Sequence, residues 1–501
     1  MSQNQEIETH LENLSADIDP TSDSLAIVLA AGHGKRIKSE TSKMLHEIWG
    51  VPTVVRVANA AKHGLRSDNQ IIVVGIKAKD VAETSGKEVN RRFAFQAEQN
   101  GTGHAVKIAL EAIPNGSYSG DIYIFPGDMG LLSVEAVQKF KDAYHNNPCD
   151  MMILTGVFEG AASDNYYGRV LRVPAEDING QSAGDNFSKV IEIKEQKDIL
   201  ALELNETYRV NYKGRTYGFT KEKLVDLREF NTGVYAFKAD KIIACINKLS
   251  TDNVQGELYL TDLIRIFNEN DLTVKASEAV DNRTVLGFNV KSVLKEMESY
   301  ARESVYEKLK DIITIVDEDD FFIADEVVEE IIELDKKSGP LDISVGKGAW
   351  IDKGVQLNKR IKIGNHAELS GRVILGEGVR IHENVEVSTY SNQTLKVGSN
   401  SEIFKGDIIK GSLEIGKNCR IESSVNMTGS DEFPTRIGNN VTIKGPSYIF
   451  GSTVEDDVWI EHSVLKCKHI KRVENADGTV QAIRYFLPKA EGLQAIDDLI
   501  K

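Results

Sequence analysis

The stretch Leu25–Lys43 combines a strand-like run, a loop of small residues and two cations, a pattern suited to binding a phosphorylated ligand. Residues 25–29 are all apolar, as in a buried parallel strand. The tight loop Ala-Ala-Gly-His-Gly at 30–34 follows, and its small residues let a ligand approach the backbone, whose N–H groups can bind phosphate oxygens. Arg36 and Lys43 would add the positive charge that a triphosphate needs. A plain strand-to-helix turn with two solvated cations is the alternative, because short glycine motifs often match by chance.

Asp128 is a second candidate, because it directly follows a strand-like run at 121–125 and a Pro-Gly pair. A carboxylate in that position can bind a hard cation, and Mg²⁺ prefers one or two carboxylates together with substrate phosphates and water. The alternative is that Asp128 caps the helix expected from Ser133 onward or fixes the turn.

A third candidate segment begins at Gln96, whose amide offers the donor and the acceptor needed to read a pyrimidine edge. Gly101 and Thr102 then lead into a predicted helix, which allows close backbone approach and leaves free N-terminal amides. Thr102 could instead cap that helix, and the two roles are compatible.

The elements that must position these residues alternate between strand and helix over residues 25–150. We expect strands at 25–29, 70–75, 93–96 and 121–125, with helices at 53–63 and 103–112. This alternation predicts a parallel sheet with helices on both faces. Ligands of such sheets bind outside the carboxyl ends of the strands, which is where the glycine loop and Asp128 lie.

Taken in order, these motifs resemble the sugar-1-phosphate nucleotidyltransferases. The resemblance is closest to the uridylyltransferase half of the bacterial bifunctional enzyme that makes UDP-N-acetylglucosamine. LAAGxGxR, a Lys seven residues later, QAEQxGTGHA and a strand ending in Gly-Asp carry the likeness. It continues over about residues 25–305, through Tyr-Gly-Arg-Val at 167–170, Val-Ile-Glu at 190–192, Asn-Thr-Gly at 231–233, the run at 253–262 and Gly-Phe-Asn at 287–289.

The resemblance implies a Rossmann-like, GT-A-like α/β domain that uses Mg²⁺ to transfer a uridylyl group from UTP to N-acetylglucosamine 1-phosphate. Such a reaction needs no protein nucleophile, because the sugar phosphate attacks the α-phosphorus and pyrophosphate leaves. From the residues alone, Gly168 could simply permit a turn and Asn231 could fix a loop. The residues implied are Leu29, Ala30, Gly32, Gln96, Gly101 and Thr102 for the nucleotide, Arg36 and Lys43 for catalysis, Asp128 and Asn289 for Mg²⁺, and Gly168, Glu192 and Asn231 for the sugar.

The sequence departs from this family near the expected sugar pocket. Ser42 stands where a proline usually precedes the lysine, and Met129-Gly130 replaces a proline-containing loop. An insertion at about 204–227 lies between Glu192 and Asn231. These departures leave open a uridylyl- or thymidylyltransferase for another sugar 1-phosphate, such as glucose 1-phosphate, or a non-catalytic scaffold that binds nucleotide sugars.

The second half of the chain has an apolar period of six residues, which fits neither a helix nor an alternating strand. Repeats of this length predict a parallel β-helix. The family resemblance adds that the β-helix is left-handed and that it carries an acetyltransferase in the relatives. The Asn-Tyr-Asp-Gly stretch of that site does not occur after residue 340, so we expect a structural part that forms a homotrimer. The first ladder is Val345, Ile351, Leu357, Ile363, Leu369, Leu375, Ile381 and Val387.

Composition bounds the remaining possibilities. The chain has 501 residues, 41% of them hydrophobic, and a formal net charge of -16, which argues against nucleic acid or an anionic membrane as partner. No run approaches the roughly 18 apolar residues that span a bilayer, and the four cysteines are far apart, which suits a reducing cytoplasm. The predicted parts are a polar extension at 1–24, the nucleotidyltransferase domain at 25–290, a helical connector at 291–340, the β-helix at 341–465 and a tail at 466–501.

Overall fold

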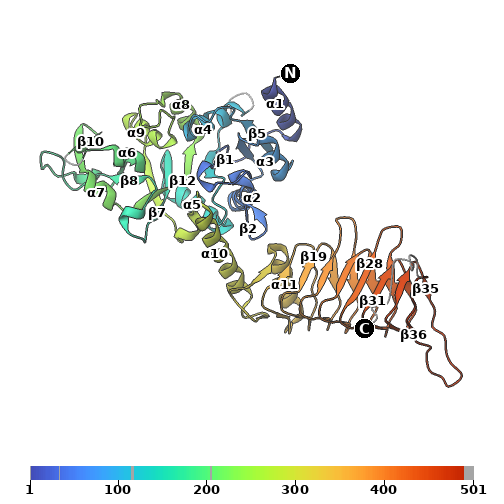
Figure 1. The fold of residues 1–501 in the computed structure, drawn as a ribbon. Coiled ribbons are helices and arrows are strands. Elements are labelled where there is room, and N and C mark those ends of the chain that lie inside the picture. The colour runs from blue at the N-terminus through green and yellow to red at the C-terminus, as the bar shows by residue number, and fades with distance from the viewer. Residues whose placement is uncertain (1, 33, 114–117, 204–205, 490–501) are drawn as a thin grey trace, which may run out of the picture. The chain divides into compact units, whose positions relative to one another are not determined.

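The computed structural model describes residues 2–32, 34–113, 118–203 and 206–489 and divides into two compact units, Met1–Glu298 and Ser299–Lys501 (Figure 1). Residues 204–205 of the predicted insertion and 490–501 of the predicted tail lie outside the described residues. No helix within the described ranges is long and apolar enough to cross a membrane.

Four parallel strands form one side of the central sheet of the first unit. They are β1 (Ser24–Ala30), β4 (Gln70–Val74), β5 (Arg91–Phe95) and β6 (Asp121–Pro126), in the spatial order β6-β1-β4-β5. The parallel arrangement predicted for residues 25–150 is therefore confirmed, with strand ends shifted by one or two residues.

The rest of the sheet is mixed, which the sequence pattern did not predict. Strand β12 (Glu229–Lys238) runs antiparallel between β6 and β7 (Met151–Val157), and β13 (Val274–Glu278) pairs in parallel with β7. The antiparallel pair β8 (Arg169–Arg172) and β9 (Val190–Lys194) joins through β8 to β12. The chain leaves the sheet after β7 and returns in the opposite direction, so β12 needs no helical crossover.

Helices cover both faces of this sheet (Figure 1). On one face Ile27, Ile71 and Ile124 share a hydrophobic cluster with residues of α4 and α9. On the other face Val28 and Phe125 pack with residues of α2 and α5. Both faces of β1 are thus buried, which explains its uninterrupted apolar run. The helices are α2 (Thr53–Leu65), α3 (Ala78–Ser85), α4 (Thr102–Glu111), α5 (Val134–Asn146), α8 (Ala239–Cys245) and α9 (Leu263–Glu269).

The N-terminal extension covers the edge strand β5. Helix α1 (Gln3–Leu14) begins with a capping box between Ser2 and Gln5. Beyond it, the Ala16 N–H donates to the Arg91 carbonyl over 2.7 Å. The Phe93 N–H donates to Ser15 Oγ over 3.0 Å. These bonds occupy backbone groups that an open sheet edge would expose.

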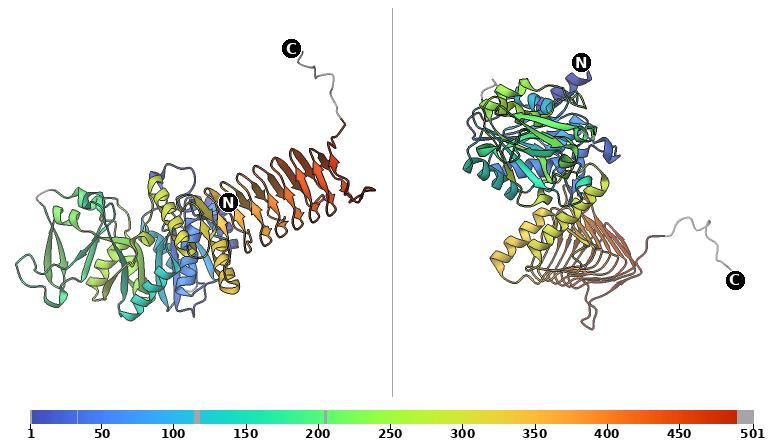
Figure 2. Two further views of the ribbon diagram at one scale, coloured as in Figure 1. Left: turned by 90° about the horizontal axis from the view of Figure 1, so that it is seen from below. Right: turned by 90° about the vertical axis from the view of Figure 1, so that its left-hand side faces the viewer.

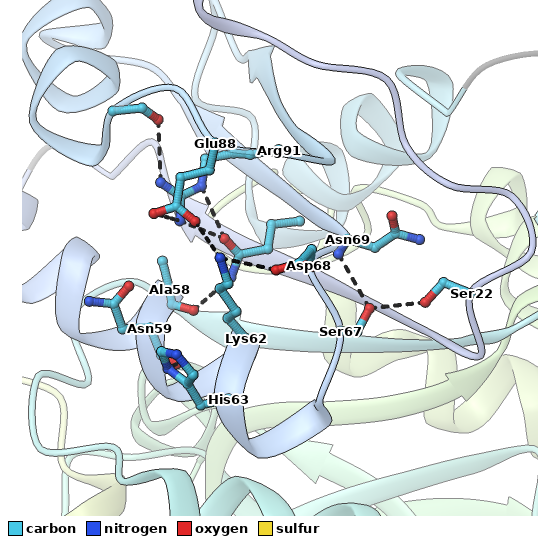
Figure 3. Close-up of polar contacts among 12 residues, drawn as sticks. Ser22, Ala58, Asn59, Lys62, His63, Ser67, Asp68, Asn69, Glu88 and Arg91 are labelled. Carbon is cyan, nitrogen blue, oxygen red and sulfur yellow. Dashed lines mark hydrogen bonds and ion pairs between the residues drawn. The ribbon is translucent and has the colours of Figure 1, made fainter.

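A polar network surrounds the buried Arg91 at the amino-terminal end of β4 and β5 (Figure 3). Arg91 is 1% exposed and donates from Nε and Nη2 to Gln70 Oε1 over 3.0 and 2.7 Å. Glu88 lies 3.4 Å from Arg91 Nη2 and 2.8 Å from Lys62 Nζ, and Lys62 also pairs with Asp68 at 3.0 Å. Every charge in this network is therefore matched by another protein group.

The insertion folds as a small subdomain around a β-hairpin. Strands β10 (Thr207–Tyr212) and β11 (Arg215–Thr220) are joined by Lys213-Gly214, both with positive φ, as in a tight two-residue hairpin turn. Short helices α6 (Gln196–Ala201) and α7 (Lys221–Asp226) flank them. The members of its hydrophobic cluster come from both the hairpin and the β8–β9 pair, and include Leu171, Ile191, Ile199, Val210, Tyr217 and Leu224.

The second unit is a left-handed parallel β-helix, as predicted. Val345, Ile363 and Ile381 stack in register, so one regular coil spans three six-residue repeats. Figure 2 shows this stack in two further views. Helix α10 (Lys291–Leu309) precedes the stack in the sequence, and α11 (Asp325–Ser338) lies between its first strands in the sequence.

The described part of the stack contains strands of three parallel sheets. Strands β14 and β15 pair with β16 and β17, so the stacked structure begins within the predicted connector. The first sheet has β14 (Thr314–Ile315), β16 (Ser344–Val345), β18 (Lys362–Ile363), β21 (Arg380–Ile381), β24 (Glu402–Ile403), β27 (Arg420–Ile421), β30 (Thr442–Lys444), β33 (Trp459–Glu461) and β36 (Ile483–Arg484). The second has β15 (Phe321–Ile323), β17 (Ala349–Ile351), β19 (Glu368–Ser370), β22 (Glu386–Ser388), β25 (Ile408–Gly411), β28 (Val425–Gly429), β31 (Ser447–Phe450) and β34 (Val464–Lys466). The third has β20 (Val373–Leu375), β23 (Leu395–Val397), β26 (Leu413–Ile415), β29 (Thr435–Ile437), β32 (Thr453–Val454) and β35 (His469–Ile470).

Candidate functional site

A cavity of about 530 Å³ lies at the carboxyl ends of β1 and β6 in the first unit. Most of the sequence-predicted site residues line it, although Ala30, Gly168 and Glu192 do not. The side chain of Ala30 is buried in the core beneath the loop. The predicted residues that line the cavity are Leu29, Gly32, Arg36, Lys43, Gln96, Gly101, Thr102, Asp128, Asn231 and Asn289.

The glycine loop is shaped by close contact with Lys43. Gly34 has a φ of 60°, and a Cβ placed on it would lie 2.8 Å from Lys43 Cβ. A side chain at this position would therefore be strained and would displace the lysine. The Leu29 carbonyl accepts from the Gly127 N–H over 2.9 Å, which ties the start of the loop to the end of β6.

Lys43, Asp128 and Asn289 form one polar cluster in the cavity. The Lys43 ammonium donates to Asp128 Oδ2 and, over 2.9 Å, to Asn289 Oδ1. Lys43 is only 7% exposed and lies over the Phe288 ring, 5.4 Å from its centroid. Ser133, not Asp128, caps α5, because Ser133 Oγ accepts from the Ala136 N–H at 3.1 Å. The helix-cap alternative for Asp128 is therefore wrong.

The donor set of this cluster fits Mg²⁺. Asp128 and Asn289 present two oxygens close enough to bind the same cation, since the Lys43 ammonium bridges them. Mg²⁺ takes few protein ligands when substrate phosphates and water complete its shell. The described residues contain no group of three or more His, Cys, Asp or Glu side chains that could hold a metal ion.

Gln96 and the start of α4 form a second wall. Gln96 is 3% exposed, and its Nε2 donates to the Gly101 carbonyl over 3.2 Å. Gly101 has a φ of 103°, and a Cβ there would collide with the Leu258 carbonyl. Thr102 is the first residue of α4 and not its cap, and its hydroxyl accepts from the Leu260 N–H over 3.2 Å. The loop before α4 is thereby joined to the segment around 258–260.

Asn231 also lines the cavity, and β12 has an irregular register between Asn231 and Val234. Asn231 Oδ1 accepts from the Gly233 N–H at 3.0 Å and from the Tyr235 hydroxyl at 2.9 Å. The loop-fixing role that the sequence left open is therefore present. The Asn231 N–H also donates to the Gly168 carbonyl over 2.9 Å, so the backbone of Gly168 helps to position Asn231.

Glu195, which the sequence analysis did not single out, lines the cavity in place of Glu192. Glu192 lies within β9, and its Oε1 accepts from the Tyr208 hydroxyl of the insertion at 2.5 Å. Glu195 is the first residue after β9, and its carboxylate needs the space beside Gly168, where a Cβ would lie 3.1 Å from Glu195 Oε1. The strand-end rule that selected Asp128 would also select Glu195, but only once the end of β9 is known. Thr261, also missed, lines the same side.

Burial raises the pKa of Glu195 to about 7, and the neighbouring carboxylates of Asp198 and Asp262 contribute to the shift while Lys197 opposes it. Burial likewise raises the pKa of Glu192, although the Tyr208 hydroxyl opposes that shift. A group that is close to half ionised near neutral pH and faces a cavity is a candidate for ligand contact.

Comparisons with known proteins agree with this geometry. Residues 26–181 match a family model described as a MobA-like NTP transferase domain. The chain is similar to the bifunctional protein GlmU of Clostridium tetani, with 30% identity over 477 residues covering 86% of this chain and 94% of that protein. It is 28% identical over 484 residues to the GlmU of Caldanaerobacter subterraneus, covering 87% and 93%. It is 31% identical over 304 residues to that of Bacillus licheniformis, covering 60% and 58%.

Proposed function

Because the chain belongs to the family of bifunctional GlmU proteins and is a nucleotidyltransferase, we propose that it makes UDP-N-acetylglucosamine and pyrophosphate from UTP and N-acetylglucosamine 1-phosphate. The observation that carries the proposal is that one cavity brings together the glycine loop, the buried Gln96 amide and the Lys43 cluster with Asn231 and Glu195. We call the part of the cavity lined by Asn231 and Glu195 the acceptor wall.

The nucleotide half of the cavity would take UTP. The loop around Gly32 would approach the nucleotide through its backbone, and Gln96 beside Gly101 would read the uracil edge. Arg36 and Lys43 would neutralise the phosphates as charge develops. Mg²⁺, held by Asp128 and Asn289, would supply further neutralisation of the phosphate oxygens.

The acceptor half would hold the sugar phosphate. Asn231 is fixed by two hydrogen bonds, and Glu195 lies on the same wall. We therefore place Glu195 in the sugar-contact role that the family resemblance assigned to Glu192. Held there, the sugar phosphate oxygen attacks the α-phosphorus of UTP in line, and the P–O bond to pyrophosphate breaks. The protein contributes alignment and charge neutralisation and no covalent intermediate.

The test is pyrophosphate release from UTP or dTTP with Mg²⁺ and a panel of sugar phosphates. We expect the highest kcat/KM with UTP and N-acetylglucosamine 1-phosphate, ahead of glucosamine 1-phosphate and glucose 1-phosphate. Absence of release with every pair would refute the proposal and favour a scaffold that only binds nucleotide sugars.

A second candidate keeps the reaction and changes the sugar. The observation that favours it is the insertion hairpin, whose Tyr208 contacts Glu192 of strand β9, three residues before Glu195 in the acceptor wall. A clear preference for glucose 1-phosphate or another sugar phosphate in the same assay would select this candidate.

We propose that the β-helix has a structural role and assembles three copies of the chain. In support, Trp350 and Ile408 are 44% and 36% exposed in the sheet that contains β17 and β25. His382 and His469 are paired with Glu402 and Glu455, at 2.8 and 3.0 Å. Light scattering should give the mass of a trimer, and acetyl-CoA should not be consumed with glucosamine 1-phosphate. Rapid consumption would overturn the structural role.

A further inference from the structure

The insertion hairpin contacts strand β9 through one short hydrogen bond. The Tyr208 hydroxyl donates to Glu192 Oε1 at 2.5 Å, and the Lys194 ammonium lies over the Tyr208 ring, 4.3 Å from its centroid. Both partners of Tyr208 thus belong to β9, and they are two residues apart on it. A hydrogen bond to a charged acceptor is among the stronger side-chain contacts in proteins.

Strand β9 ends at Lys194, and the next residue is Glu195, whose side chain lines the cavity. Glu195 is also the N-cap residue of α6, and its carbonyl accepts from the Ile199 N–H over 3.0 Å. A shift of β9 would therefore move the Glu195 carboxyl and the first turn of α6 together.

The helix that follows the hairpin, α7, contacts the carboxyl end of α6. Lys221, at the start of α7, donates from Nζ to the carbonyls of Leu200 and Leu202, over 2.8 and 2.7 Å. Ile199 of α6 and Val210 of β10 share one hydrophobic cluster. The insertion thus contacts the segment on both sides of Glu195, and none of its residues from 206 to 227 lines the cavity.

We propose that the insertion hairpin is a buttress for the acceptor wall and that Tyr208 is a positioning residue, which acts through Glu192 and β9 to fix the Glu195 carboxyl against the sugar phosphate. This inference rests on the proposed function for the identity of the ligand. It assigns the hairpin a role in recognition of the acceptor and none in recognition of the nucleotide, because Gln96 and the glycine loop lie on other elements.

The test compares Tyr208→Phe, Glu192→Ala and the double variant with Tyr212→Phe in the full chain. Tyr212 is the matched control, because it lies in the same strand and in the hairpin's own hydrophobic cluster. We expect Tyr208→Phe to raise KM for the sugar phosphate about tenfold. The KM for UTP should change by less than about twofold, because nucleotide contacts are untouched. Glu192→Ala should have a similar effect, and the double variant should be no worse than either single change.

Hydrogen–deuterium exchange supplies a readout that does not depend on turnover. Peptides covering 190–201 should exchange faster in Tyr208→Phe than in wild type or Tyr212→Phe, while peptides around Gln96 should be unchanged. If no sugar phosphate is turned over by the wild type, the proposed function fails and the exchange comparison alone decides the buttress. Equal behaviour of Tyr208→Phe and Tyr212→Phe, or an equal rise in both KM values, would overturn the buttress.

Discussion

Lys43 and Arg91 are both buried cations of the first unit, 7% and 1% exposed, and their surroundings differ. Arg91 donates to Gln70 twice and to the Ser85 and Gly86 carbonyls. It also pairs with Glu88 (Figure 3). Lys43 has a carboxylate and an amide oxygen as partners, and both line the cavity.

This difference separates a structural cation from one that we propose to neutralise charge on the substrate. The partners of Arg91 lie within the protein at the amino ends of β4 and β5, where no cavity of the proposed site reaches. The partners of Lys43 lie at the carboxyl end of β6, where a metal ion or a phosphate could take over either contact. We expect substitutions at Arg91 to change the free energy of unfolding and substitutions around Lys43 to change turnover.

The largest effect is expected from Asp128→Asn, which keeps an oxygen for Lys43 and removes the carboxylate. Turnover should fall by more than about 10³-fold, because charge neutralisation at the phosphates is lost. Pyrophosphate release measures it, and the thermal midpoint should stay close to wild type. Near-normal activity in a folded Asp128→Asn protein would refute the metal role of Asp128.

Arg91→Met should be the most destabilising change, with a loss of about 2–4 kcal/mol, because it leaves the buried Gln70 Oε1 and the Ser85 carbonyl without their donor. Urea unfolding measures this loss. Arg92→Met is the matched control: Arg92 pairs with the exposed Glu12 at 3.0 Å, and such surface pairs contribute about 0–1 kcal/mol. Equal losses from the two variants would contradict the stabilising role of the Arg91 network.

Lys43→Met should lower kcat by about 10²–10³-fold, the range for removal of one preorganised donor. It should also tighten Mn²⁺ binding to the nucleotide-free protein, because the ammonium no longer occupies the oxygens of Asp128 and Asn289. Electron paramagnetic resonance of free Mn²⁺ measures this affinity without turnover. Weaker Mn²⁺ binding in Lys43→Met would contradict the idea that lysine and metal compete for the same oxygens.

A smaller effect concerns Glu195, whose pKa burial raises to about 7. Its carboxyl is neutral below this pH and ionised above it, where it adds a negative charge near Asp198, Asp262 and the proposed position of the acceptor phosphate. The KM for the sugar phosphate should therefore rise about fivefold between pH 6 and pH 8. Glu195→Gln should remove this dependence, since the amide stays neutral. The same shift means that the stability contributed by neutral Glu195 is present at low pH and is lost as the pH rises through about 7.

Particular residues show how much of the fold and of the candidate site the sequence predicts. The apolar run of β1 indicates the α/β sheet, and the six-residue ladder from Val345 indicates the β-helix. Both patterns are visible in the sequence because the buried positions in each are occupied by apolar residues. The motif order also indicated that Lys43 and Asn289 belong together, although 246 residues separate them.

Glu195 was missed because sequence alone does not locate the end of β9. The β8–β9 pair has a register shift between Leu171 and Arg172, and strand alternation counted through such a bulge misplaces the following side chains. The antiparallel entry of β12 was missed for a related reason. It depends on how the chain returns from the subdomain around the insertion, and no local pattern in β12 records that path.

The smallest expected effect comes from Ser15→Ala, at the same end of β5 as Arg91. Ser15 Oγ accepts from the Phe93 N–H at 3.0 Å and donates to the Leu11 carbonyl at 2.8 Å, so both contacts are neutral. Their loss should cost about 1 kcal/mol in urea unfolding and leave turnover unchanged. Thr9→Ala, which removes an exposed hydroxyl bonded to the Gln5 carbonyl at 2.8 Å, should change stability by less than about 0.5 kcal/mol. If Ser15→Ala matched the loss from Arg91→Met, coverage of the edge strand, and not the charged network, would be what stabilises this end of the sheet.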